Sequence, residues 1–281
     1  MALNHIYLWS IFGIFVLFFL FGYFYRISIW LRGSDSATKK DKPDVSVCKK
    51  FFNYVSRFFK KIFSREFTGI FKSFFSDGMV HKNLFKDSIL KWLIHIFMFL
   101  GTSAFAVLTL LHLIAVASAG GGPITEGVSW FIKVFGTIEN RFTALALDLS
   151  KFAILLGALL AVIRFVLLKN KYKSVELKDK SAGIILSVLA ILGFLYEAAY
   201  FNFMGTAPAT AAFAPGGFIL SLILSFIDTG WGLATHILFY IYVSAVLLFV
   251  TTIPYGKYSH MVFGPIVAVC NKLNSKEVGK V

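Results

Sequence analysis

Five long apolar segments constrain this sequence more than any other feature. They lie at about residues 6–25, 91–117, 143–168, 183–204 and 230–253. Each has about 20 or more mostly apolar residues, the length that an α-helix needs to cross about 30 Å of hydrocarbon. Only 15% of the chain is charged, whereas soluble domains are typically near 25%. The sequence therefore predicts an all-α integral membrane protein, with five transmembrane helices in a single membrane domain over residues 1–281.

The positive charges predict the orientation of this bundle. Residues 26–91 contain 15 Lys/Arg and 6 Asp/Glu, the 169–182 loop contains 5 and 2, and the chain from Pro254 onward contains 4 and 1. The two connections on the other side, 118–142 and 205–229, together contain two Lys/Arg and three acids. Because Lys and Arg are retained on the cytoplasmic side, we expect the N-terminus outside and the C-terminus inside, in a multi-pass protein of the cytoplasmic membrane.

The connection at residues 26–90 is a basic insertion with an amphipathic stretch, "KKFFNYVSRFFKKIFSREFTGIFKSFF". Its apolar residues at helical spacing are Phe51, Phe52, Val55, Phe58, Phe59, Ile62 and Phe63. This pattern predicts a helix in the cytoplasmic interface. The helix would lie on membrane lipid or bind a soluble partner, and the two roles are compatible; so apolar a segment is not expected to bind nucleic acid. The connections "GGGPITEGVSWFIKVFG" and "PGGFILSLILSFIDTG" indicate two short helices on the outer surface.

Several kinds of chemistry are excluded by the motifs that the sequence lacks. The two cysteines, Cys48 and Cys270, are both expected in the reducing cytoplasm. No C-x-x-C-H sequence is present for a c-type haem, and no cysteine cluster is present for an iron–sulfur centre. No Gly-rich phosphate loop or Ser/His/Asp set stands out. The histidines remain as the residues with distinctive chemistry.

Four of the six histidines fall at matched depths on two helices. His95 and His112 are 17 residues apart on the helix at 91–117, about 25 Å along its axis. His236 is near the outer end of the helix at 230–253, and His260 follows its inner end. Because these helices run in opposite directions, His95 and His260 are expected at the inner edge of the membrane. His112 and His236 are expected near the outer edge.

Two imidazoles that face each other across a helical bundle are a common way to bind a haem iron. The four histidines therefore predict two haem b groups, an inner one on His95 and His260 and an outer one on His112 and His236. A site for metal-ion transport is the main alternative, although its ligands should gather at one depth. The small residues at 101–104 would let a macrocycle or a neighbouring helix approach closely.

Two stretches of this sequence resemble a known family. "PYGKYSHMVFGP" is similar to the end of the last helix in the gamma, cytochrome b, subunit of respiratory nitrate reductase, and "KWLIHIFMFLG" is similar to the first haem-ligand helix of that family. The membrane cytochromes of heterodisulfide reductase and of the sulfite-reduction complex of sulfate reducers belong to the same group. The resemblance covers about two thirds of the chain. It implies a dihaem cytochrome b that links membrane quinol to a cytoplasmic iron–sulfur subunit.

The sequence also departs from the nitrate reductase pattern. Phe105 and Tyr242 stand at the positions where that branch has its outer haem ligands. His112 is seven residues further out on one helix, and His236 is six residues further out on the other. The outer pair is therefore preserved as a pair, which favours the branch that resembles heterodisulfide reductase. The insertion at 26–90 has no counterpart in the resemblance.

Other polar residues in the apolar segments suggest further roles. Glu197 lies in the outer half of its helix, where a charged group is costly unless it is paired or hydrated. It would accept a proton from quinol, or it would be a carboxyl hydrogen-bonded within the bundle. Arg164 would pair with propionates of the inner haem or extend its head group to the membrane surface. Asp148 and Lys151 are three residues apart and are expected to pair with each other.

These expectations describe an electron-transfer subunit of an anaerobic respiratory oxidoreductase. Electrons would pass between a membrane quinone pool, or a phenazine-type carrier, and a cytoplasmic iron–sulfur partner. The sequence does not choose the direction of electron flow. The alternative class is a membrane scaffold or an ion-conducting subunit whose histidines bind no haem.

Overall fold

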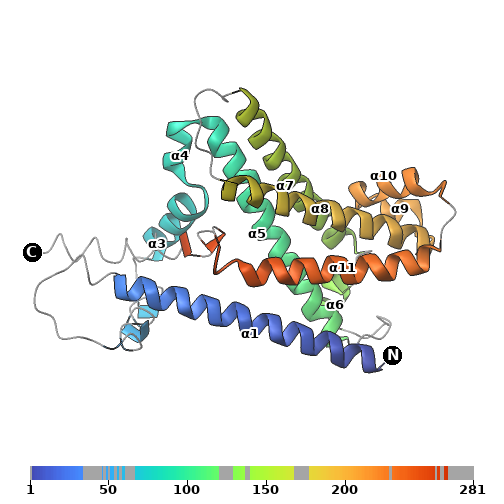
Figure 1. The fold of residues 1–281 in the computed structure, drawn as a ribbon, viewed down its shortest axis with the longest axis horizontal. Helices are drawn as coiled ribbons and strands as arrows, with labels where there is room; N and C mark the ends of the chain where they lie inside the picture. Colours follow the sequence, from blue (N-terminus) through green and yellow to red (C-terminus); the bar gives the residue numbers. More distant parts are fainter. Residues whose placement is uncertain are drawn as a thin grey trace, which may run out of the picture. The chain divides into compact units, whose positions relative to one another are not determined.

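The computed structural model describes a helical chain. The described residues are 2–33, 46, 49, 51–53, 56, 59–60, 67–119, 129–136, 140–167, 177–227, 230–256, 258–259 and 263–264. Among these residues no β-strand occurs. The long helices are α1 (Ala2–Gly33), α5 (Ile89–Ser118), α7 (Arg141–Leu167), α8 (Leu177–Met204) and α11 (Trp231–Thr252). The short ones are α3 (Phe67–Ser73), the π-helical turn η1 (Phe74–Met79), α4 (Lys82–Asp87), α6 (Trp130–Phe135), α9 (Pro208–Ala211) and α10 (Pro215–Leu224) (Figure 1).

The five predicted spanning helices are confirmed as helices of sufficient length and apolarity. The apolar stretches are Phe12–Ile29, Ile89–Val116, Arg141–Val166, Gly183–Met204 and Trp231–Thr252. Four of them match the expected ranges closely; the first begins and ends a few residues later than expected. The protein is thus an all-α, multi-pass membrane protein, and its orientation and the identity of its membrane stay predictions.

The chain divides into two compact units. The first comprises Met1–His5 and Ser88–Leu248, and the second comprises Ile6–Asp87 and Phe249–Val281. The candidate site residues that can be placed lie in the first unit, because His260 falls outside the described residues. Each unit is considered by itself below.

The closest helix pair in the first unit is α5 with α7, and glycines make this approach possible. A Cβ atom added to Gly101 on α5 would lie 3.0 Å from Ala153 Cβ on α7. A Cβ atom added to Gly157 on α7 would lie 2.6 Å from Met98 Cγ on α5. The small residues at 101–104 were expected to let a macrocycle or a neighbouring helix approach. At Gly101 the neighbour is a helix, because α7 occupies the space beside it.

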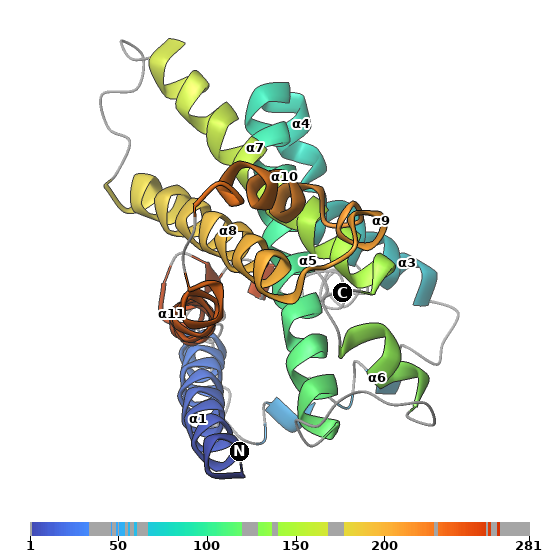
Figure 2. The same ribbon diagram turned by 90° about the vertical axis from the view of Figure 1, so that its right-hand side faces the viewer.

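The second close contact joins α8 to α10, which lies alongside it in both views (Figures 1 and 2). Glycines at the start of α10 again allow the contact. A Cβ atom on Gly217 would lie 2.6 Å from Glu197 Cβ, and one on Gly216 would overlap the Phe194 ring. Any larger side chain at these two positions would push α10 away from α8.

Helix α11 meets its neighbours through aromatic rings. Tyr242 stacks on Tyr196 of α8 with centroids 5.9 Å apart, and it meets Phe105 of α5 edge-on at 6.4 Å. Phe239 also contacts Tyr196, with ring centroids 5.7 Å apart. Aromatic rings separate the backbone of α11 from α5 and α8, so these helices approach less closely than α7 approaches α5 or α10 approaches α8.

In the second unit, α1 packs against the chain that follows α11. Tyr255 Oη donates a hydrogen bond of 3.0 Å to Phe18 O, and its ring lies over Gly22. Tyr23 stacks on Phe263 at 5.2 Å. Burial raises the pKa of the Tyr258 phenol above its usual value. The contacts of Tyr255 and Phe263 place the chain after α11 against α1.

The basic insertion is described only in part. Of its predicted apolar residues, Phe51, Phe52 and Phe59 are helical, and Phe52 and Phe59 are exposed. The others, Val55, Phe58, Ile62 and Phe63, lie outside the described residues, so the amphipathic helix stays a prediction. The two short helices expected in the other connections are present as α6 and α10. Their position on the outer surface follows only from the predicted orientation.

Candidate functional site

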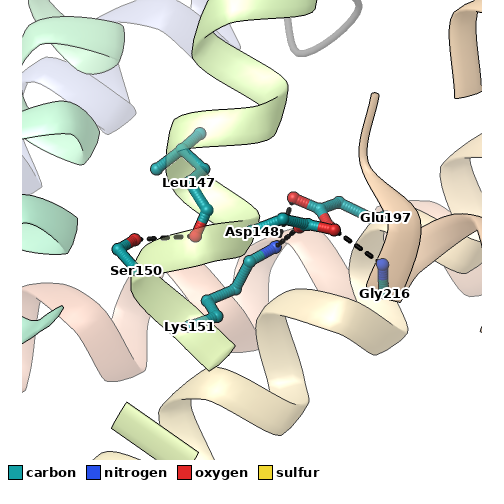
Figure 3. A network of polar contacts seen from close by, with 6 residues as sticks. All are labelled: Leu147, Asp148, Ser150, Lys151, Glu197 and Gly216. Atoms are coloured by element: carbon teal, nitrogen blue, oxygen red, sulfur yellow. Dashed lines mark hydrogen bonds and ion pairs between the residues drawn. The ribbon is translucent and has the colours of Figure 1, made fainter. Parts of the chain in front are cut away.

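A buried cluster of three charged side chains joins α7 to α8. Lys151 Nζ lies 2.7 Å from Asp148 Oδ1, and these residues are one helical turn apart on α7. The same Nζ lies 2.5 Å from Glu197 Oε1 on α8. The exposed fractions of the three residues are 0% for Asp148, 1% for Lys151 and 6% for Glu197. The expected pairing of Asp148 with Lys151 is therefore confirmed, and Glu197 is a third member (Figure 3).

The cluster also connects to the first turn of α10. This helix begins after Ala214, which has no side chain able to cap it, and with Pro215, which has no N–H. Its first N–H groups have no partner within the helix. Gly216 N donates a hydrogen bond of 2.7 Å to Asp148 Oδ2 (Figure 3). Asp148 thus caps a helix that starts 67 residues later in the sequence, where the positive end of the helix dipole favours a carboxylate.

Lys151 also contacts an aromatic ring and the backbone of α8. Besides the two carboxyl groups, its Nζ lies 4.4 Å above the centre of the Phe194 ring, within the range of a cation–π contact. Its stem crosses α8 at Gly193, where an added Cβ atom would lie 3.0 Å from Lys151 Cδ and 3.3 Å from Tyr242 Oη. Glycine at this position allows Lys151 to reach Glu197.

The cluster lies well inside the apolar part of the bundle. Lys151 is ten residues from Arg141 at the start of α7, which is about 15 Å along the axis. Glu197 is seven residues from Met204 at the end of α8, which is about 10 Å. Charged residues at such a depth are costly and usually face the bundle interior in pairs. This arrangement is typical of proton and ion pathways, and it also ties helices together.

A second polar site forms where α6 ends against α5 and α7. The last carbonyl groups of α6 belong to Lys133, Val134 and Phe135, and they receive hydrogen bonds from Asn140, Thr143 and His112 respectively. The distance between His112 Nδ1 and Phe135 O is 2.6 Å. Because a carbonyl oxygen only accepts hydrogen bonds, Nδ1 carries the ring proton. In the neutral ring, Nε2 then keeps its lone pair.

This arrangement of His112 fits a ligand of haem iron. Ligating histidines almost always donate their second ring N–H to a carbonyl, a carboxylate or water, which fixes the tautomer and the ring orientation. The same contact also caps the negative end of α6, where a histidine is favoured for structural reasons alone. The geometry of His112 is therefore suited to a metal ligand without being specific to one.

Of the other predicted haem ligands, His95 and His236 belong to the described residues. His95 stacks on Phe99 of the same helix with centroids 5.4 Å apart. His236 is exposed on α11 and makes no hydrogen bond or ring contact with the part of the chain that the structure describes. His260 lies outside that part, so the inner pair stays a prediction. Arg164 is half-buried in the last turn of α7.

Phe105 of α5 and Tyr242 of α11 contact each other, so they mark the faces on which these two helices meet. His112 follows Phe105 by seven residues, about two full turns, so both lie on nearly the same face of α5. His236 precedes Tyr242 by six residues, which rotates it about 120° away from the face of α11 that meets α5. The two histidines of the predicted outer pair thus lie on faces of α5 and α11 that do not coincide.

The comparisons with known proteins do not add a family. No family model, no curated protein and no solved structure matches this chain. The resemblance to membrane cytochromes b therefore stays an expectation.

The contact between Glu197 and Lys151 was not predicted, although the sequence contains a signal for it. The apolar parts of α7 and α8 carry few charged residues, and the two helices run in opposite directions. Counted from the ends that share one side of the membrane, Lys151 and Glu197 differ in depth by about 5 Å. Comparing the depths of charged residues, as was done for the histidines, would have predicted that Lys151 and Glu197 lie close together.

Proposed function

We propose that the chain is a cytochrome b type electron carrier that connects a membrane quinone, or a phenazine-type carrier, with a cytoplasmic iron–sulfur subunit. Two haem b groups would be held by His95 with His260 and by His112 with His236. The observation that carries this proposal is the contact of His112 Nδ1 with Phe135 O, which leaves Nε2 of a half-buried ring with its lone pair. The depths that the sequence predicts for the four histidines support the pairing.

When bound, the haems would supply one-electron transfer between the two faces of the membrane. The chain's own residues have separate tasks. His112 is oriented by α6, and Arg164 at the other end of the bundle is a candidate partner for haem propionates. Glu197, in its ionised form, is the candidate acceptor for a proton that quinol oxidation releases. Lys151 stabilises that ionised form, because its Nζ lies 2.5 Å from Glu197 Oε1.

The positive charge of the basic segments supports docking of the partner on the cytoplasmic side. Residues 26–91 have a formal net charge of +9, from 15 Lys/Arg and 6 Asp/Glu. They lie on the predicted cytoplasmic side, where they would attract an acidic partner surface and anionic lipid. Electrons that move inward while protons stay outside carry charge across the membrane, at about 2.3 kcal/mol per charge per 100 mV.

A second candidate function has its own supporting observation. A proton- or ion-conducting subunit without haem would need charged groups inside the bundle, and the cluster of Asp148, Lys151 and Glu197 provides them. In that case the histidines would be capping and interfacial residues, as the bond from His112 to α6 would allow.

A reduced-minus-oxidised visible spectrum of the purified full-length chain separates the two functions. The cytochrome proposal predicts the absorption bands of haem b. His112→Ala should weaken them by the contribution of one haem, whereas Lys133→Ala on the exposed side of α6 should leave them unchanged. A chain that folds in its membrane and yet shows no haem bands would exclude the cytochrome proposal and favour the ion-conducting one.

A further inference from the structure

The three charges of the α7–α8 cluster do not balance. With all groups ionised, Asp148 and Glu197 contribute two negative charges and Lys151 contributes one positive charge, which leaves one excess negative charge. All three residues are at least nine-tenths buried. Each buried ion costs several kcal/mol even after relaxation, and an uncompensated charge in hydrocarbon is among the most costly groups in a membrane protein. One bound proton removes the imbalance.

Other polar groups near the cluster do not supply the missing positive charge. Helix α10 contributes the backbone N–H of Gly216 and, within Pro215–Leu224, has no titratable side chain. The adjoining aromatic residues on α8 and α11, Tyr196 and Tyr242, stack on each other and contribute neutral phenols. Among the described residues, Lys151 is the one cation that reaches either carboxyl group.

The two carboxyl groups differ in a way that indicates where the proton resides. Both oxygens of Asp148 have a partner: Oδ1 lies 2.7 Å from Lys151 Nζ, and Oδ2 accepts the N–H of Gly216. Glu197 contacts Lys151 through Oε1, and its carboxyl group also lies within hydrogen-bonding reach of the Asp148 carboxyl group. Among the described residues, Glu197 Oε2 and Asp148 Oδ1 are both buried without a hydrogen-bond partner, but Asp148 Oδ1 has its ion pair with Lys151 and Glu197 Oε2 has none. An ionised oxygen in that position loses more than a neutral one, because desolvation costs are larger for charged groups.

Packing around Glu197 keeps this difference in place. The backbone of α10 covers Oε2 so closely that a Cβ atom on Gly217 would lie 2.9 Å from it. No side chain can enter from that position to donate a hydrogen bond. Asp148, in contrast, is held by the N-terminal end of the same helix. Helix α10 thus stabilises a negative charge on Asp148 and offers none of this stabilisation to Glu197.

We propose that the cluster of Asp148, Lys151 and Glu197 is a binding site for a single exchangeable proton, which Glu197 carries in the resting protein as a neutral carboxylic acid. Release of the proton leaves the electron pair on the Glu197 carboxylate and gives the cluster a net charge of −1. Rebinding of one proton restores neutrality. The site does not depend on haem. If the chain oxidises quinol, Glu197 must first release its resting proton, so that release comes before uptake in each cycle.

Infrared spectroscopy of the full-length chain in lipid bilayers at neutral pH tests this assignment. Exposed carboxyl groups are ionised at this pH, so the carbonyl stretch of a protonated carboxyl reports a buried acid. We expect one such band, shifted by transfer to heavy water and by isotope-labelled glutamate, and absent in Glu197→Gln. Asp148→Asn should also remove it, because the remaining Lys151 and ionised Glu197 are neutral together.

The labelled wild-type protein decides the question even if a variant does not fold. A band that shifts with labelled aspartate instead of labelled glutamate would place the proton on Asp148 and overturn the assignment. Absence of any exchangeable carboxyl band, or its persistence in Glu197→Gln, would overturn the proton site. None of these readouts involves electron transfer, so their failure is distinct from failure of the cytochrome proposal.

Discussion

Two polar sites lie in the same helix bundle and differ in charge. One is the charged cluster between α7 and α8, and the other is the histidine site at the end of α6. In the cluster, Lys151 meets two carboxyl groups, and one of them also caps α10. At the histidine site, one ring nitrogen of His112 caps α6, and in the neutral ring the other nitrogen keeps its lone pair. A charge inside hydrocarbon must be paired by the protein itself, whereas a neutral imidazole can retain an unused lone pair. The cluster is therefore suited to hold a proton, and the histidine to hold a metal.

Glu197→Gln should have the largest effect on activity. The amide keeps the shape and the neutral charge of the proposed resting acid, so the variant should fold and bind haem as the wild type does. Quinol-driven haem reduction should slow by about 100- to 10,000-fold, the usual contribution of a positioned acid–base group. Stopped-flow reduction by a quinol analogue measures this rate, and chemical reduction by dithionite serves as the control. A normal rate with quinol would leave Glu197 with a structural role only.

Lys151→Met should have the largest effect on stability. It leaves two carboxyl groups in the bundle without their cation, and loss of one partner of a buried ion pair typically costs about 3–5 kcal/mol. Thermal unfolding in detergent, followed by circular dichroism, measures the loss. Lys133→Met removes an exposed lysine from α6 and should change little. Equal melting temperatures for the two variants would show that the cluster does not stabilise the bundle.

Features that depend on residues close together in the sequence could be predicted, whereas contacts between distant residues could not. The five spanning helices could be predicted because their length and apolarity are local properties, and the pair of Asp148 and Lys151 follows from spacing on one helix. The contact of Asp148 with Gly216 could not be predicted, because it depends on where α10 docks after 68 further residues. The exposure of His236 depends on the rotation of α11, which its uniformly apolar surface does not reveal.

Gly216→Ala should have an intermediate effect, and it tests the link between α10 and the cluster. The added methyl group would overlap the Phe194 ring and move the N–H that Asp148 accepts. Overpacking of this kind typically costs about 1–3 kcal/mol. Gly183→Ala on α8 is the matched control, because its new Cβ atom would meet only Met98 Cε at 3.8 Å. If both variants unfold at the same temperature, α10 is not held against α8 as described.

Thr143→Val should have the smallest effect, and it concerns the histidine site. Thr143 Oγ1 donates to Val134 O at 2.5 Å, next to the carbonyl group that binds His112. Loss of one such hydrogen bond typically costs about 0.5–1.5 kcal/mol. The outer haem should also change its midpoint potential in a redox titration, because α6 would hold His112 less firmly. Thr252→Val, which removes a hydrogen bond within α11, should leave that potential unchanged.

A count of haem groups per chain tests the separation of the two sites most directly. Haem extracted from equal amounts of purified wild type, His112→Ala and Glu197→Gln should amount to two, one and two groups per chain. That result would assign metal binding to the histidine site and proton binding to the charged cluster. A wild-type chain without haem, or a haem content that falls with Glu197→Gln and not with His112→Ala, would contradict the account.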